Sequence, residues 1–158
     1  MELTPGALTS YQTAKAEIGL TDDDRRFELV RIINAVSDAM ARVADRAFHY
    51  QVDIVERVAG GDGARLVLPR APISSVASIV LVDEDGTVGH TFSSSDYEIE
   101  DANAGFLWRH TNWPWQAQSS GGIIGEPVSG KTRQLIKVTY TAGWVTPAQD
   151  LTDSTLTR

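Results

Sequence analysis

Residues 22–47 constrain the fold most, because they carry a long and uninterrupted helical pattern. The stretch contains neither glycine nor proline. Its apolar residues recur at the three- and four-residue spacing of one helix face, and further ones widen that face to about half of the cylinder. The first set is Phe27, Val30, Ile33, Met40, Val43 and Ala47, and the widening set is Leu29, Ile32 and Val36.

The start of this stretch carries the signals of a helix N-terminus. Thr21 is a favourable N-cap residue, and Asp24, three residues later, completes a capping box. Asp22, Asp23 and Asp24 lie where the helix dipole favours negative charge. About 26 residues at about 1.5 Å each predict a rod of about 39 Å. Such a helix cannot bury a wide apolar face on itself, so we expect the rest of the chain and neighbouring copies to cover it.

The composition excludes several kinds of protein. With 158 residues, 42% of them hydrophobic, the chain can build the core of one domain, or of one domain with a projecting lobe. It has no cysteine, which excludes disulfides and thiolate metal sites. His49, His90 and His110 lie far apart, so we expect no metal site. We find neither an apolar run of membrane-spanning length nor a signal peptide, and therefore expect a soluble protein made in a cytoplasm.

The formal net charge of −7 bears on contact with nucleic acid. An acidic surface disfavours general binding, because attraction to the phosphate backbone supplies most of that affinity. The same charge suits DNA that slides past without adhering. Solubility is the simpler explanation of the charge, and the sequence leaves both open.

Shorter segments on either side of the long helix predict a mixed fold. Residues 10–18 follow Thr9, a suitable N-cap, and end at Gly19, so they predict a short helix that packs against the long one. After residue 47 the pattern changes to short β-favouring runs separated by turns. The predicted strands are residues 49–58, 66–68, 76–82, 88–92, 96–100, 106–108 and 134–141. The first two could pair as a hairpin, and an Asp-Gly hairpin turn at residues 83–86 predicts that residues 88–92 return beside residues 76–82.

The order of these segments predicts an α+β fold, in which an N-terminal helical hairpin with one long helix is followed by an antiparallel β lobe. We expect residues 1–48 to form the helical part of the core and residues 49–145 to form the β-rich lobe. Within the lobe, residues 111–132 are rich in Gly, Ser, Gln and Pro and predict a loose loop. Residues 146–158 predict a polar C-terminal tail, in which the large apolar residues are Leu151 and Leu156.

Residues 125–132 match the phosphate-binding pattern GxxxxGK[ST], with Lys131 and Thr132 at its end. That motif binds phosphate because its loop opens a helix, whose N-terminus supplies the anion site. Here residues 133–140 resemble a strand, and the aspartate-bearing strand at residues 79–83 precedes the loop instead of following it. We therefore expect no nucleotide binding and interpret the match as a polar hairpin loop.

Trp108, Trp113 and Trp115 form an aromatic cluster around Pro114. Such rings stack on sugars, anchor a partner protein or close one end of a β lobe. We expect closure for Trp108. Trp113 and Trp115 lie in a Gly- and Ser-rich segment and are the candidate contacts with neighbouring subunits or other partners, with closure as the open alternative.

The remaining motifs do not point to catalysis. The acidic runs at residues 22–24 and 83–85 lack the spacing of an EF-hand, and helix capping and turn solvation explain them. The sequence contains no Gly-x-Ser-x-Gly or His-Glu-x-x-His motif and no clear pair of catalytic carboxylates. We therefore expect no metal, no cofactor and no enzymatic activity.

A set of short motifs occurs in a fixed order between about residues 8 and 150. In that order they are Ala16-Glu17-Ile18-Gly19-Leu20, Ala44-Asp45-Arg46-Ala47-Phe48, Leu66-Val67-Leu68-Pro69-Arg70-Ala71-Pro72-Ile73, Ser75-Val76, Val82-Asp83, Asp96-Tyr97-Glu98, Gly105-Phe106-Leu107, Trp113-Pro114 and Val138-Thr139-Tyr140-Thr141-Ala142-Gly143-Trp144. The ordered set resembles the head-to-tail connector proteins (adaptor or head-completion proteins) of tailed bacteriophages and gene-transfer particles. Each motif alone has little specificity, so the resemblance depends on their order.

This resemblance implies a structural protein of the virion neck, assembled in the host cytoplasm. About twelve copies would form a homo-oligomeric ring below the portal protein and extend the DNA channel to a stopper or other neck or tail protein. DNA would pass through without sequence-specific binding, and no membrane would be involved. The family has a small helical core, a β lobe in its longer members, and one or more helices after the Thr-Ala-Gly-aromatic segment. Here we expect only the polar tail at that place.

A ligand-binding β module is the alternative function. It would recognise a sugar or a nucleotide with Trp113, Trp115 or Lys131. Titration calorimetry against nucleotides and glycans separates the two classes, because only the module would release or absorb heat.

We predict that Lys131→Ala leaves thermal stability and assembly nearly unchanged. The lysine is expected in a polar loop, where substitutions usually alter the free energy of unfolding by about 0.5 kcal/mol or less. Titration of both proteins with ATP checks the prediction. Saturable ATP binding by the wild type, lost in the variant, would contradict it.

Overall fold

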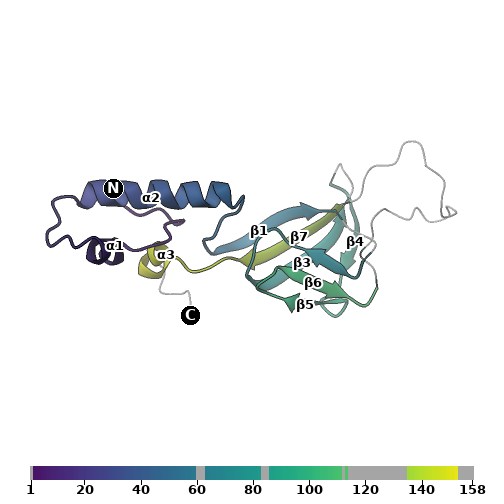
Figure 1. Ribbon diagram of the computed structural model, residues 1–158. Helices are drawn as coiled ribbons and strands as arrows, with labels where there is room; N and C mark the ends of the chain where they lie inside the picture. Colours follow the sequence, from purple (N-terminus) through teal and green to yellow (C-terminus); the bar gives the residue numbers. More distant parts are fainter. Residues whose placement is uncertain (1, 60–62, 83–85, 112, 114–134, 153–158) are drawn as a thin grey trace, which may run out of the picture. The chain divides into compact units, whose positions relative to one another are not determined.

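The computed structural model has an α+β fold whose paired strands run antiparallel (Figure 1). The structure describes residues 2–59, 63–82, 86–111, 113 and 135–152. The chain divides into two compact units: unit 1 comprises residues 1–51 and 143–158, and unit 2 comprises residues 52–142. Unit 2 lies within the expected β lobe of residues 49–145, and residues 49–51 and 143–145 of that range fall in unit 1.

The described part of unit 1 contains three helices, α1 (Tyr11–Glu17), α2 (Arg26–Val43) and α3 (Pro147–Thr152) (Figure 1). The N-cap of α1 is Ser10 rather than Thr9, and its side-chain oxygen accepts a hydrogen bond from the backbone N–H of Thr13 at 3.0 Å. Helix α3 is a correction, because residues 146–158 were expected to form only a polar tail. Its six residues are too few for a periodic pattern to be visible in the sequence.

Helix α2 is shorter than the predicted helix of residues 22–47. It begins after Arg25, whose side chain makes no capping hydrogen bond, so the capping box predicted from Thr21 and Asp24 is wrong. At the other end, Asp45 adopts a φ of 49°, in the left-handed region that ends a helix. The helical part of the stretch therefore has 18 residues.

Among the aspartates before α2, Asp23 joins this segment to α1 instead of capping a helix. The carboxylate of Asp23 accepts hydrogen bonds from the Tyr11 hydroxyl and the Lys15 ammonium, each at 2.6 Å. The Asp22 carboxylate accepts from the backbone N–H of Asp24 at 3.3 Å. The ammonium and the hydroxyl of α1 lower the pKa of Asp23, so the carboxylate stays charged in this contact.

The core of unit 1 uses only part of the apolar face of α2. Its buried residues are Ala7, Tyr11, Leu29, Val30 and Ile33, with Leu3, Ala14, Leu20 and Ala148 packed against them. Leu29, Ile33 and the buried Ser37 are four residues apart, which places them in one row along α2. The N-terminal segment, α1 and α3 therefore all contribute to this core.

The described residues of unit 2 form seven strands in two sheets. One sheet has the order β1-β7-β3-β4 and the other the order β2-β6-β5. The strands are β1 (Gln51–Val58), β2 (Arg65–Val67), β3 (Ile73–Val82), β4 (Val88–Phe92), β5 (Tyr97–Asp101), β6 (Phe106–Arg109) and β7 (Leu135–Ala142). Each predicted strand is present, with ends displaced by up to three residues.

Of the two hairpins predicted from the sequence, one is confirmed and the other is wrong. β3 and β4 pair antiparallel, with Ile79 opposite Phe92, as the Asp-Gly turn between them predicts. The expected hairpin of β1 and β2 is wrong, since β2 pairs with β6 and β1 lies beside β7. The β2–β6 pairing places Leu66 opposite Leu107, and both side chains are fully buried. Burial gained by this distant pairing outweighs the small extra entropy of closing a longer loop.

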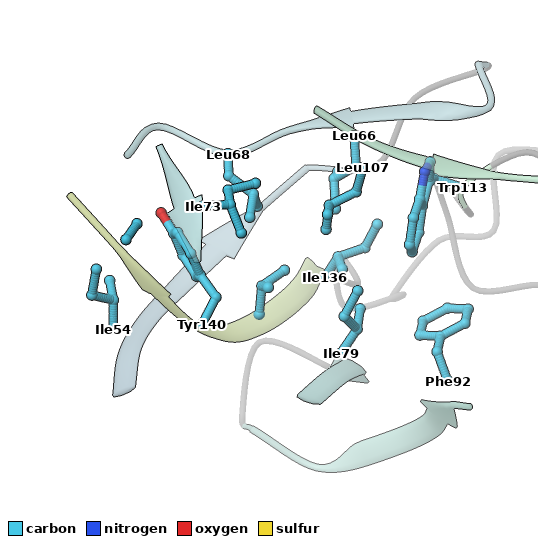
Figure 2. Packing of buried hydrophobic residues seen from close by; sticks show 12 residues of the cluster. Ile54, Leu66, Leu68, Ile73, Ile79, Phe92, Leu107, Trp113, Ile136 and Tyr140 are labelled. Carbon is cyan, nitrogen blue, oxygen red and sulfur yellow. The ribbon is translucent and has the colours of Figure 1, made fainter. Parts of the chain in front are cut away.

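The core of unit 2 lies between the two sheets (Figure 2). Ile136, Val138 and Tyr140 alternate along β7 and are completely buried, as are Ile79 of β3 and Leu107 of β6. Figure 2 also labels further residues of the same cluster, Ile54, Leu66, Leu68, Ile73, Phe92 and Trp113. The alternation that predicted β7 therefore marks the inward side of the strand.

We predict that Ile33→Asp prevents folding of unit 1, because the substitution places an unpaired charge in its core. Phe27→Asp is the matched control, since Phe27 lies on the same helix and is 62% exposed. Circular dichroism melting of both variants measures the difference. A cooperative melt of Ile33→Asp near that of Phe27→Asp would show that the inward face has been misassigned.

Candidate functional site

One row of apolar side chains on α2 remains exposed. Ile32, Val36, Met40 and Val43 are spaced four, four and three residues apart, so they share one face of the helix. Their side chains are 48%, 52%, 52% and 89% exposed. We call these four residues the apolar stripe. It adjoins the buried row of Leu29, Ile33 and Ser37. One part of the wide apolar face predicted from the sequence is therefore buried in the core, and the apolar stripe is the part that is exposed.

The opposite border of the buried row is covered by the N-terminal segment. The Asn34 side chain accepts a hydrogen bond from the backbone N–H of Thr4 and donates one to the carbonyl of Glu2, each at 3.0 Å. The Ser37 hydroxyl accepts from the backbone N–H of Leu8 at 3.0 Å. Residues 2–8 therefore lie along the side of α2 away from the apolar stripe. Among the described residues, the chain covers one border of its core row and leaves the other uncovered.

A second exposed feature of unit 1 is Trp144, whose side chain is 47% exposed. The Arg46 guanidinium carbon lies 5.3 Å from the ring centroids of both Phe48 and Trp144, within the range of a cation–π interaction. The backbone of Trp144 is held on both sides, because its N–H donates to the Phe48 carbonyl at 2.8 Å and its carbonyl accepts from the Tyr50 N–H at 2.7 Å. Trp144 is thus a large aromatic side chain held in one place at the surface.

The residue before Trp144 must be glycine. Gly143 has a φ of 108°, and a Cβ built on it would lie 2.3 Å from the carbonyl oxygen of His49. Only a residue without a Cβ allows His49 and Trp144 to come together in their β-bridge. The glycine of the motif Thr-Ala-Gly-Trp is the sequence signal of this close approach. The motif did not indicate that the Trp144 side chain is a candidate surface contact.

The structure corrects the expectation for Trp113. Its side chain is 1% exposed, and its indole N–H donates to the carbonyl of Ala64 at 2.8 Å. Its ring packs edge-on to Phe92 at 5.5 Å, with the Arg109 guanidinium 5.7 Å from it. A partner cannot reach a side chain in this position, so Trp113 closes the β core (Figure 2).

The predictions for Trp108 and Trp115, the other two tryptophans of the aromatic cluster, stand differently. Trp108 was expected to close the lobe, but it is only partly buried and packs edge-on against His110 at 4.5 Å. Trp115 lies outside the described residues, and its assignment as a subunit or partner contact stays a prediction. Lys131, Thr132 and the rest of the phosphate-loop match also lie outside them. The described segment that follows that match is β7, a strand and not the helix that a phosphate loop opens.

A polar cluster lies within unit 2. The Tyr140 hydroxyl donates to the Glu56 carboxylate at 2.5 Å and accepts from the backbone N–H of Arg70 at 3.3 Å. The Arg70 guanidinium donates to the other oxygen of Glu56 at 3.2 Å. Burial, followed by the hydrogen bond to Glu56, raises the pKa of Tyr140 well above its ordinary value. These contacts join β1, β7 and the segment after β2, so the cluster stabilises the fold.

The described parts of the chain also bear on metal binding and on membrane insertion. In those parts, histidine, aspartate and glutamate side chains form no group of three or more that could hold a metal ion. None of the described helices is both long and apolar enough to cross a membrane. The acidic run at residues 83–85 lies outside the described residues.

Comparisons with known proteins gave no match. Neither the family models nor the curated proteins nor the solved structures contain one that matches this chain.

We predict that Tyr140 makes stability sensitive to alkaline pH. Because the folded state raises the pKa of Tyr140, this group contributes its full stability below about pH 10, and the free energy of unfolding falls as the pH rises further. Tyr140→Phe should flatten that fall and should lower stability at neutral pH by about 1–3 kcal/mol, since the Glu56 carboxylate loses the hydroxyl donor and keeps the Arg70 guanidinium. Urea denaturation at neutral and alkaline pH measures both effects. An equal alkaline loss in variant and wild type would contradict the assignment.

Proposed function

We propose that this protein is a head-to-tail adaptor of a tailed bacteriophage or gene-transfer particle, and a structural virion protein rather than an enzyme. The observation that carries the proposal is the apolar stripe of α2, four large side chains on one helix face that the described chain leaves exposed. Large exposed apolar patches on small proteins mark interaction sites. The ordered set of sequence motifs gives the class of assembly.

A closed ring needs two different and complementary patches on every subunit. In the proposed assembly, α1 and α2 act as an N-terminal helical hairpin with one long helix, and the apolar stripe supplies the first patch. The β lobe that follows supplies the second, where Val52 and Val55 of β1 are exposed apolar residues. Trp115 is the further candidate contact, to a neighbouring subunit or to a stopper or other neck protein.

The charge of the chain suits a DNA channel. With a net charge of −7 per subunit, a ring of about twelve copies would be strongly acidic. Phosphates would not adhere to such a surface, so DNA could leave the head through it without sequence-specific binding. The ring would sit below the portal protein and extend its channel.

The alternative function, a β module that binds a sugar or a nucleotide, has less support. Of its three proposed ligand contacts, Trp113 is buried in the core and the other two, Trp115 and Lys131, lie outside the described residues.

We predict that particles lacking this protein form DNA-filled heads that leak DNA or carry no tails. Electron microscopy of a deletion lysate tests this directly. Purified wild-type protein should restore tail joining, and Phe27→Glu, on the same helix, should restore it equally. Val36→Glu should fail, because it places a charge in the middle of the apolar stripe. Infectious tailed particles made without the protein would rule out the proposal.

A further inference from the structure

The apolar stripe has a border that allows another helix to come close. Ala35 and Ala39 lie one turn apart and follow Ile32 and Val36 by three residues, so they form the outer edge of the stripe. Their side chains end at Cβ, so another helix can approach this edge of the stripe closely. Ridges of residues four apart, such as Ile32, Val36 and Met40, pack into the matching grooves of a second helix. The stripe therefore has the form of a helix-packing surface.

The length of the stripe restricts which helix of this chain can cover it. The stripe runs over about 16 Å of a helix that is about 27 Å long. Helices α1 and α3 have seven and six residues. Both pack on the core of α2 within unit 1 through Tyr11 and Ala148. Of the described helices, only α2 of a second copy is long enough and has an uncovered apolar face.

The charges at the two ends of α2 set the direction of such a pair. Glu28 lies in the first turn, beside Ile32, and Arg42 lies in the last turn, beside Ala39, on the same border of the stripe. In an antiparallel pair, Glu28 of each copy faces the end that carries Arg42 of the other. In a parallel pair, the borders that carry these charges would lie on opposite sides of the contact, and Glu28 and Arg42 would not meet. Antiparallel packing also brings each positive helix end to the negative end of its neighbour.

We propose that the free protein forms a homodimer in which the apolar stripes of two α2 helices pack antiparallel about a two-fold axis. The contact is formed by the same patch on both copies. It therefore differs from the head-to-tail contact of the proposed ring, and it protects the stripe before assembly. The inference concerns the purified protein and does not depend on the phage assignment.

Sedimentation equilibrium over a range of protein concentrations tests the dimer. Wild type should behave as a reversible dimer. Val36→Glu should raise the dimer dissociation constant by about 100-fold or more, because a charge would enter the apolar contact. Val43→Glu, at a position that is 89% exposed, should act in the same direction without affecting the fold. Phe27→Glu, an exposed apolar residue on another face of the same helix, is the matched control and should leave dimerisation unchanged.

A charge exchange tests the antiparallel direction. Glu28→Arg and Arg42→Glu should each weaken the dimer, by about tenfold at low salt, because each change affects two symmetric contacts. The double variant should return to near the wild-type dissociation constant. Arg42 also lies 3.4 Å from Asp38 in its own chain, so melting curves of the dilute variants must show that the monomer is intact.

Each outcome decides between defined alternatives. A wild-type monomer at high concentration, or a dimer that survives both Val36→Glu and Val43→Glu, overturns the inference. Failure of the double charge variant to recover overturns the antiparallel arrangement. A ring in solution that depends on the stripe also overturns the two-fold contact, while it supports the adaptor function. A stripe-dependent dimer together with infectious particles made without the protein leaves this inference standing and removes the proposed function.

Discussion

The pairing of β3 with β7 is the interaction on which the rest of unit 2 depends. Both strands lie inside the four-stranded sheet, and Ile79 faces Val138 in their shared register. Every inward side chain described on β7 is completely buried, and each such side chain contributes about 1.5–3 kcal/mol relative to exposure. β4 pairs with β3 and β1 lies beside β7, while the second sheet covers the inward face (Figure 2). The buried tyrosine of β7 also requires the polar cluster with Glu56 and Arg70, because its hydroxyl would otherwise lose its hydrogen bonds.

The strands were predictable because alternation is a local property of the sequence. What was missed depended on contacts between distant residues. The aspartates before α2 had the composition of a helix cap, but Asp23 is held by Tyr11 and Lys15 of α1, outside the helix. Trp113 lies beside a polar and Gly-rich segment, yet Ala64 and Phe92, far away in the sequence, bury it. β2 pairs with β6, some forty residues later, rather than with its neighbour β1, because this pairing buries Leu66 opposite Leu107.

The candidate site, too, could be predicted only in part from the sequence. The spacing of apolar residues revealed the wide face of α2, but spacing cannot distinguish the half that the chain buries from the half that it exposes. That division depends on where the N-terminal segment and α1 pack, through Asn34, Ser37 and Tyr11. An apolar face wider than the core beneath it is a sequence signal of association, and the structure locates the residues that carry it. Trp144 was missed as a surface residue because the glycine before it signals a close backbone approach but does not show whether the next side chain is buried or exposed.

The bridge between His49 and Trp144 lies where the chain leaves unit 1 for unit 2 and where it returns. Unit 2 is an insertion, since the chain leaves unit 1 after residue 51 and returns to it at residue 143. The bridge holds the departing and returning segments next to each other within unit 1. An inserted domain whose two ends meet in this way can be lengthened, shortened or exchanged without stretching the host around it. The helical unit can therefore keep its packing while the β lobe diverges, which makes the lobe the part of the molecule most open to change between relatives.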